Sequence, residues 1–355
     1  MKFRSLFLSA LCLLSVSCFI SCSDDDDDDD DITSGILILN EGSYQGNNAS
    51  ITAYNPKTGG ITADLYYALN DKKLGDAGQD MITYGNRVYI TVYGSSRLVK
   101  LDSLGRELKA ITFSPADGQP RYMAAEDGKL YVTLWSGQVA RIDTTDLTIE
   151  KYVTVGANPE QIVEENDKLY VANSGYGAGT TVSVINLGIF TVEKIITVVQ
   201  NPNLIVEAAG DIYVLSYGNY GDIPYALQRL NVANGTCDNI AVATKMTAHG
   251  DIIYLVNSVT DWSVKPYVTT NNFFTYNAKT RKLNENSFLT LTGDAESLKT
   301  ESIMMMEIDP YTGDIYIGTS DYTNTGDVYR FSRNGKLIKK FGSGGISPNN
   351  AVFFE

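Results

Sequence analysis

A short motif in which apolar and polar positions alternate recurs along the whole chain. In most copies a Gly or Asp stands shortly before a hydrophobic residue, a Tyr and a second hydrophobic residue, as in residues 167–171. Alternation with a period of two is typical of a β-strand, because successive side chains point to opposite faces. The central positions of the seven copies are Leu37, Tyr89, Tyr131, Tyr170, Tyr213, Tyr254 and Tyr316.

The spacing of these copies predicts the architecture. They lie about 40 to 60 residues apart, close to the length of one four-stranded propeller blade. The longest interval contains an insertion around residues 286–302. A second strand follows each copy and ends in a hydrophobic residue before a short polar one, as in Ile185-Asn186. The sequence therefore predicts an all-β fold, a β-propeller of seven blades, with the repeated tyrosines in its core.

The two ends of the propeller are expected to meet. The first copy begins at the second strand of a blade, and residues 346–355 are similar to the segments that precede other copies, such as residues 157–163. We expect this C-terminal strand to pair beside residues 36–40 and close the ring, because closure removes two exposed sheet edges.

The first 31 residues are typical of a lipoprotein leader and tether. Lys2 and Arg4 precede an apolar stretch too short to span a bilayer, which predicts a signal peptide over residues 1–21. Cys22 is the predicted lipidation site, with Cys18 as the alternative. Residues 22–31, which include eight consecutive Asp, form the predicted surface-export tether, and residues 32–355 form the propeller. The predicted location is the outer membrane, lipid-anchored and facing the cell exterior; an anchor facing the periplasm is the alternative.

Composition argues against several functions. The formal net charge of -14 makes nucleic acid an unlikely partner, since phosphates would be repelled. The one histidine, His249, has no partner motif, and no phosphate loop or zinc signature occurs. We therefore expect no enzyme and no cofactor. Carboxylate-only hydrolysis, or a calcium ion held by oxygen ligands as a structural or lactonase site, stays open.

Two resemblances follow from particular segments. Residues 168–174, continuing to 181–186, resemble the repeat of YVTN-type (YncE-like) propellers. Residues 37–44, 74–79 and 328–338 are similar to Bacteroidetes surface lipoproteins of the DUF5074 class, as is the poly-Asp tether after Cys22. The class includes a cobalamin-binding surface lipoprotein that sits over the outer-membrane cobalamin transporter. The resemblance therefore implies a seven-bladed propeller that captures a nutrient.

Candidate ligand-binding residues lie on the face where the loops after the repeated strands open. An aromatic residue follows each repeated strand, among small polar residues, and such aromatics offer flat apolar faces with polar tips. These residues are Tyr44, Tyr93, Trp135, Tyr176, Tyr217, Tyr220, Trp262 and Tyr322. Packing within or between blades is the alternative role for each of them.

Polar residues near the propeller axis complete the candidate site. They stand at the starts of the predicted inner strands, and we single out Arg121, Gln161 and Asn203. An arginine that is partly withdrawn from water is a good donor to amide or phosphate oxygens. Holding water in the central channel is the alternative role for these residues.

The predicted function is capture of a nutrient at the cell surface for a TonB-dependent outer-membrane transporter. Cobalamin or a related corrinoid is the favoured ligand, because of the resemblance alone. A glycan-binding lipoprotein, a calcium-dependent hydrolase or lactonase, and a structural surface-layer protein are the alternatives.

Overall fold

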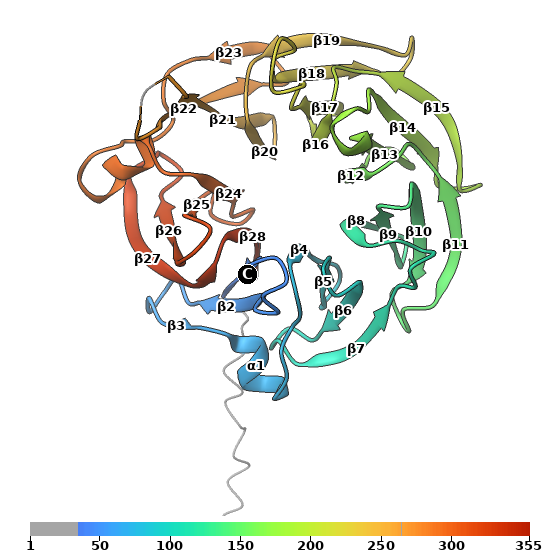
Figure 1. Cartoon of the computed structure of the whole chain (residues 1–355), viewed down its shortest axis with the longest axis horizontal. Coiled ribbons are helices and arrows are strands. Elements are labelled where there is room, and N and C mark those ends of the chain that lie inside the picture. Colours follow the sequence, from blue (N-terminus) through green and yellow to red (C-terminus); the bar gives the residue numbers. More distant parts are fainter. Residues whose placement is uncertain (1–34, 264) are drawn as a thin grey trace, which may run out of the picture. The chain divides into compact units, whose positions relative to one another are not determined.

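The computed structural model describes residues 35–263 and 265–355. These residues form seven antiparallel sheets of four strands, arranged around a central axis as the blades of a propeller (Figure 1). The predicted seven-bladed β-propeller is therefore confirmed. The predicted signal peptide, Cys22 and the acidic tether lie outside the described residues.

Blades 1 to 3 contain the following strands, given from the inner to the outer strand of each blade. Blade 1 consists of β28 (Pro348–Phe353), β1 (Ile36–Asn40), β2 (Ser50–Tyr54) and β3 (Ile61–Thr62), and is followed by helix α1 (Leu65–Asn70). Blade 2 consists of β4 (Gly78–Thr83), β5 (Val88–Val92), β6 (Arg97–Leu101) and β7 (Glu107–Thr112). Blade 3 consists of β8 (Pro120–Glu126), β9 (Lys129–Leu134), β10 (Gln138–Asp143) and β11 (Ile149–Thr154).

The remaining blades follow the same order. Blade 4 consists of β12 (Pro159–Glu164), β13 (Lys168–Asn173), β14 (Thr181–Asn186) and β15 (Thr191–Thr197), with the 3₁₀ turn η1 (Gly175–Gly177) between β13 and β14. Blade 5 consists of β16 (Pro202–Ala208), β17 (Asp211–Ser216), β18 (Ala226–Asn231) and β19 (Thr236–Ala241). Blade 6 consists of β20 (Lys245–His249), β21 (Ile252–Asp261), β22 (Val268–Asn277) and β23 (Lys282–Asn284). Blade 7 consists of β24 (Ile303–Ile308), β25 (Ile315–Thr319), β26 (Thr325–Phe331) and β27 (Leu337–Ile346), and the predicted insertion before it contains the 3₁₀ helix η2 (Gly293–Lys299).

The ring closes in blade 1, as predicted. β28 pairs antiparallel with β1, and the register places Ile36 opposite Phe353 and Ile38 opposite Ala351. The C-terminus accordingly lies beside β28 among the blue strands of blade 1 (Figure 1). Blade 1 therefore joins the two ends of the propeller in one sheet.

The hydrophobic core lies between neighbouring blades. Tyr316 of blade 7, for example, belongs to one buried cluster with Ile36 and Tyr54 of blade 1. Five of the six repeated tyrosines are buried, in agreement with the prediction. Tyr254 is half-buried, and its ring meets Phe288 of the insertion edge-to-face at 5.1 Å. Large apolar side chains at these positions account for the tight contact between blades.

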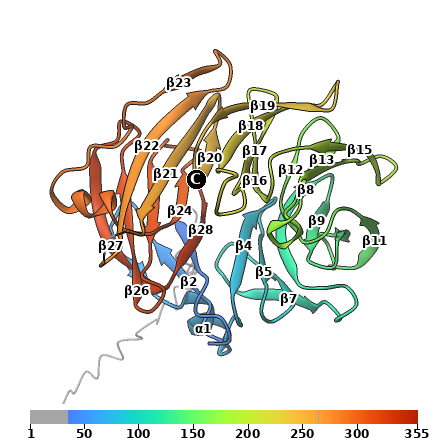
Figure 2. The ribbon, with the colours of Figure 1, turned by 45° about the horizontal axis from the view of Figure 1, so that its top comes forward.

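The inner strands begin with a local irregularity. Asn158, Asn201 and Ser347 each adopt a positive φ directly before a proline. Asn tolerates this left-handed conformation, and a following proline disfavours the right-handed helical one. In six blades the pairing of the inner strand then shifts register, which is the mark of a β-bulge. Figure 2 shows these inner strands, among them β4, β8 and β16, around the central opening.

Candidate functional site

The bulges put polar side chains at one end of the central channel. We call this end the top face: here the inner strands begin and the second strands finish, as the pairing of Pro159 with Asn173 illustrates. Residues skipped by the register shifts leave the regular alternation of the strand. They are Gln79, Arg121, Tyr122, Glu160, Gln161, Asn203, Met304 and Asn349. The predicted residues Arg121, Gln161 and Asn203 are therefore all bulge residues.

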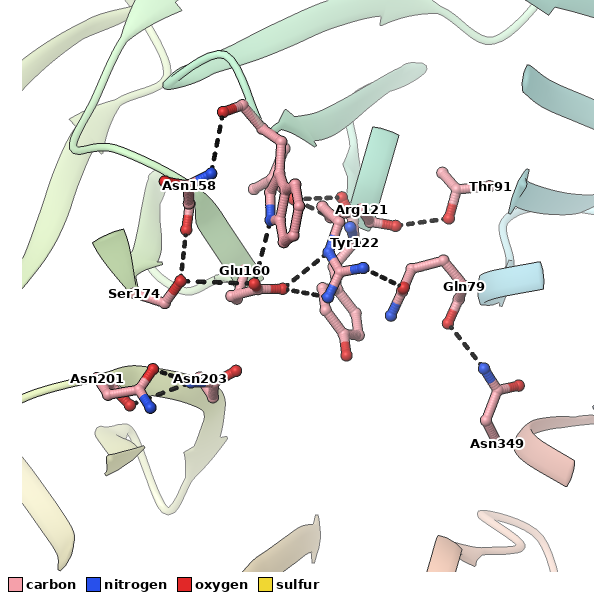
Figure 3. Close-up of polar contacts among 12 residues, drawn as sticks. Gln79, Thr91, Arg121, Tyr122, Asn158, Glu160, Ser174, Asn201, Asn203 and Asn349 are labelled. Atoms are coloured by element: carbon pink, nitrogen blue, oxygen red, sulfur yellow. Dashed lines mark hydrogen bonds and ion pairs between the residues drawn. The ribbon is translucent and has the colours of Figure 1, made fainter. Parts of the chain in front are cut away.

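Arg121 is bound on both sides by neighbouring blades. Its Nε and Nη2 donate to Oε2 of Glu160 in blade 4 at 2.9 and 2.7 Å, and its Nη1 donates to Oε1 of Gln79 in blade 2 (Figure 3). Glu160 is only 4 % exposed. Burial is the largest single influence and opposes the charge of Arg121, but Glu160, Tyr122 and Tyr93 together raise the arginine pKa. The positive charge of Arg121 and the negative charge of Glu160 therefore compensate each other, and the pair presents almost no net charge to a ligand.

Three predicted aromatic residues form a row over this pair. The Arg121 guanidinium lies 4.9 Å from the Tyr93 ring and 5.0 Å from the Trp135 ring. Trp135 meets Tyr93 and Tyr176 edge-to-face, at 5.1 and 5.8 Å between ring centres. The Trp135 indole also donates to Oε1 of Glu160 at 3.1 Å. We call Tyr93, Arg121, Trp135, Glu160 and Tyr176 the Arg121 cluster.

The row is packed at one end and open at the other. Tyr93 and Trp135 are half-buried, so their rings mainly contact other members of the cluster. Tyr176, in turn η1, is 79 % exposed and has a positive φ of 54°. A residue other than glycine rarely adopts this backbone conformation. At Tyr176 the conformation holds the tyrosine ring outside its own blade. Tyr176 therefore offers an aromatic surface to a ligand.

The other predicted aromatics do not join this row. Tyr217 and Tyr220 both pack on Tyr225 in blade 5, and the indole of Trp262 packs on Tyr267 at 4.9 Å. The Tyr322 hydroxyl lies 2.9 Å from Ser302 Oγ, and Tyr44 is exposed. Among the residues that the structure describes, no ring contact links these groups to the row or to one another. The aromatics thus form separate local groups on the top face.

Amide side chains border the rest of the channel mouth. Asn203 Nδ2 donates to Oδ1 of Asn201 at 2.7 Å, and Asn349 Nδ2 donates to the carbonyl of Gln79 at 3.3 Å (Figure 3). The same Asn349 nitrogen also donates to the carbonyl of Gly78 at 2.8 Å. Gln161 accepts from the backbone N–H of Ile205 at 2.8 Å, and its own NH₂ has no partner within the part of the chain that the structure describes. These amides add donors and acceptors without net charge.

A cavity of about 160 Å³ lies in the channel below the mouth. Its walls include Gln79, Tyr122, Glu41, Lys245 and Glu307. Sequence reasoning missed the last three residues. Lys245 begins the inner strand β20, but no Asn-Pro pair precedes it, so the repeat gave no signal; Glu41 directly follows β1.

Burial shifts the pKa values of the channel groups. It raises the pKa of Asp80 to about 7. Burial, reinforced by the charge of Asp80, raises the pKa of Glu307 to about 8. Burial also raises the pKa of Glu41 and lowers that of Lys245. All four shifts favour the uncharged form, as expected for groups withdrawn from bulk water.

The described residues contain neither a metal-binding cluster nor a membrane-spanning helix. Within residues 35–263 and 265–355, no group of three or more His, Cys, Asp or Glu side chains is placed to hold a metal ion. In the same part of the chain, no helix has the length and apolar character that crossing a bilayer requires.

Comparison with known proteins identifies the family. A domain of unknown function, DUF5074, matches residues 34–353, which is nearly the whole propeller. The chain belongs to the DUF5074 family. The expected resemblance to this family is confirmed, whereas no relative of known ligand bears on the expected likeness to a cobalamin-binding lipoprotein. No curated protein matches the chain.

Solved structures similar to this DUF5074 chain share its fold. A functionally unknown protein from Desulfotomaculum acetoxidans has a TM-score of 0.62 at 12% identity, over 90% of this chain and 98% of that one. Hydrazine synthase of Kuenenia stuttgartiensis has a TM-score of 0.59 at 17% identity, over 70% and 74%. BamB from Moraxella catarrhalis has a TM-score of 0.51 at 12% identity, over 88% and 84%. At such low identity these likenesses concern the fold alone.

Proposed function

We propose that this DUF5074 propeller is a cell-surface lipoprotein that captures a corrinoid such as cobalamin at its top face and delivers it to a TonB-dependent outer-membrane transporter. The leader and acidic tether of residues 1–31 support the location, with Cys22 as the lipidated residue. The sequence similarity to surface lipoproteins of this class supports the ligand. The observation that carries the proposal is the Arg121 cluster, with Tyr176 exposed at the channel mouth.

The chemistry of the mouth fits a large, flat and uncharged polar ligand. Tyr176 presents an aromatic surface, and the amides of Asn203 and Asn349 surround the opening. Because Glu160 already compensates Arg121, an anion would find little free positive charge there. A corrinoid has a flat macrocycle with amide groups at its edge, and stacking with amide hydrogen bonds is how such a ligand would be held.

The Arg121 cluster supports binding rather than catalysis. Its arginine and glutamate hydrogen-bond to each other, and Trp135 occupies the second carboxylate oxygen. A general acid or base needs a free proton-transfer position within reach of the substrate. Rigid, mutually satisfied side chains are instead suited to a preorganised binding surface.

Thermal unfolding with and without excess cyanocobalamin tests the proposal. A bound ligand stabilises the folded state by mass action, so the melting temperature should rise by several degrees. Tyr176→Ala should reduce this rise while leaving the melting temperature of the unliganded protein within about 1 °C, because the exposed ring contributes little to packing. Tyr311→Ala is the matched control, since Tyr311 is also exposed but lies at the opposite end of the channel.

The absence of any shift with cyanocobalamin in the unmodified protein would contradict the proposed ligand. An oligosaccharide would then be the next candidate, because Trp262 is 71 % exposed and forms an edge-to-face pair with Tyr267. Exposed aromatic pairs of this kind are also suited to sugar rings.

A further inference from the structure

The cavity below the Arg121 cluster contains hydrogen-bonding groups that have no partner among residues 35–263 and 265–355. It adjoins the mouth, because Gln79 and Tyr122 line the cavity and both also contact the Arg121 guanidinium. At about 160 Å³ it is too small for a whole cofactor-sized ligand and large enough for one short side arm.

Both donors and acceptors are unused in this cavity. Among the residues described, the Lys245 ammonium, the Glu41 carboxylate and the Tyr122 hydroxyl make no hydrogen bond or ion pair within 4 Å. The side-chain oxygen of Asn349 is buried without a partner. Polar groups withdrawn from water cost free energy unless they are paired. The cavity is therefore complementary to a guest with both kinds of hydrogen-bonding group.

The ionisable groups of the cavity restrict which kind of ligand side arm can enter it. Glu41 and Glu307 line its wall with one lysine, and the Asp80 carboxylate lies close enough to Glu307 to raise that group's pKa. A carboxylate arm would bring a negative charge into a cavity where burial already disfavours the ionised forms of Glu41, Glu307 and Asp80, and an ammonium arm would compete with Lys245. A primary carboxamide has no net charge, accepts through its oxygen and donates through its NH₂ group. It can accept from Lys245 or Tyr122 and donate to Glu41 or Asn349.

We propose that the upper channel is a pocket for an uncharged carboxamide arm of the ligand that is held at the channel mouth. This inference rests on the proposed function, since the arm belongs to the ligand bound there. The Arg121 cluster then holds the body of the ligand, and the channel discriminates between ligands that differ only in their side arms. Such a site rejects a close analogue strongly, because the wrong arm leaves buried polar groups unpaired.

Calorimetric titration tests this pocket with two probes. The first is cyanocobalamin, which has peripheral primary amides; the second is the analogue in which these amides are hydrolysed to carboxylates. The unmodified protein should bind the carboxylate form at least about 100-fold more weakly, because a negative charge then replaces a neutral donor in a cavity that disfavours ionised carboxyl groups. This comparison changes the ligand alone and does not depend on the folding of any variant.

Two substitutions then locate the discrimination in the channel. Lys245→Met should weaken cyanocobalamin binding at least about tenfold, since the hydrogen-bond donor to the amide oxygen is lost. Glu41→Gln should reduce the preference for the amide form over the carboxylate form at least about tenfold. A double-mutant cycle that combines this substitution with the change in the ligand isolates the coupling between Glu41 and the amide arm. Lys109→Met and Glu285→Gln are the matched controls, because both residues are exposed far from the channel and should change neither affinity.

The outcomes separate the two proposals. If cyanocobalamin binds and its affinity is unaffected by Lys245→Met, Glu41→Gln and amide hydrolysis, the carboxamide pocket is wrong and the channel holds only water, while corrinoid capture stands. If the unmodified protein binds neither probe, corrinoid capture fails and the pocket fails with it.

Discussion

Burial raises the pKa of Glu307 to about 8 and that of Asp80 to about 7. In the unfolded chain both groups would titrate near pH 4. Between pH 4 and about 7 to 8 the folded protein therefore binds more protons than the unfolded chain. The free energy of unfolding must fall as pH rises through this window, because stability decreases wherever the folded state retains protons that the unfolded state has lost.

The effect can be measured by urea unfolding at pH 5 and pH 8. We expect the midpoint to fall at pH 8 and expect Glu307→Gln to remove a large part of that fall, because glutamine cannot ionise. Glu285→Gln, on an exposed glutamate, serves as the control and should retain the full pH dependence. Equal pH dependence in the Glu307→Gln protein and the unmodified protein would show that Glu307 is ionised in the folded channel.

At the scale of single elements, the β-bulges decide which residues reach the channel. The sequence predicted the starts of the inner strands because Asn-Pro pairs and the repeat mark them, and it placed Arg121, Gln161 and Asn203 near the axis. It did not predict the partner of Arg121, because Glu160 lies 39 residues away in another blade. It also missed Lys245, since β20 lacks the Asn-Pro signal and pairs with β21 without a register shift.

The predicted ring of aromatics illustrates the same limit. Position after a repeated strand places an aromatic on the top face, but the length of each loop decides what its ring touches. Tyr93 and Trp135 begin short turns and pack against Arg121. Trp262 follows a strand of ten residues and packs on Tyr267 of the same hairpin. Loop geometry of this kind is not encoded in the spacing of the repeat.

Alanine substitutions at two glycines of blade 7 test how closely β28 packs against that blade. A Cβ added at Gly326 in β26 would lie 2.4 Å from Pro348 Cδ and 2.4 Å from the Thr319 carbonyl. Gly326→Ala should therefore force β28 away from blade 7 and lower the free energy of unfolding by about 2 kcal/mol or more, as overpacking does. Gly342→Ala in β27 is the control, because nothing lies within 4 Å of its added Cβ. Equal stability of both variants, measured by urea unfolding, would contradict the tight junction.

At the scale of the whole molecule, closure through blade 1 should dominate stability. Deletion of residues 348–355 removes β28, with the buried Ala351 and Val352, and exposes the inner edge of β1. We expect a loss of at least about 5 kcal/mol, from lost apolar burial and unpaired backbone groups together. Deletion of Glu355 alone is the control. A truncated protein that unfolds at the same urea concentration as the full chain would show that the blades are stable without closure.

Closure also sets the order in which the chain becomes protected against aggregation. β1 is among the first strands to be synthesised, and its partner β28 is the last. Until then one edge of β1 stays unpaired, and its sequence Ile-Leu-Ile-Leu-Asn contains no charge or proline to prevent pairing with another chain. Until β28 has been synthesised, the nascent chain therefore exposes an aggregation-prone β-strand edge at β1. A holding chaperone that engages residues 36–40 would protect the chain for that entire interval.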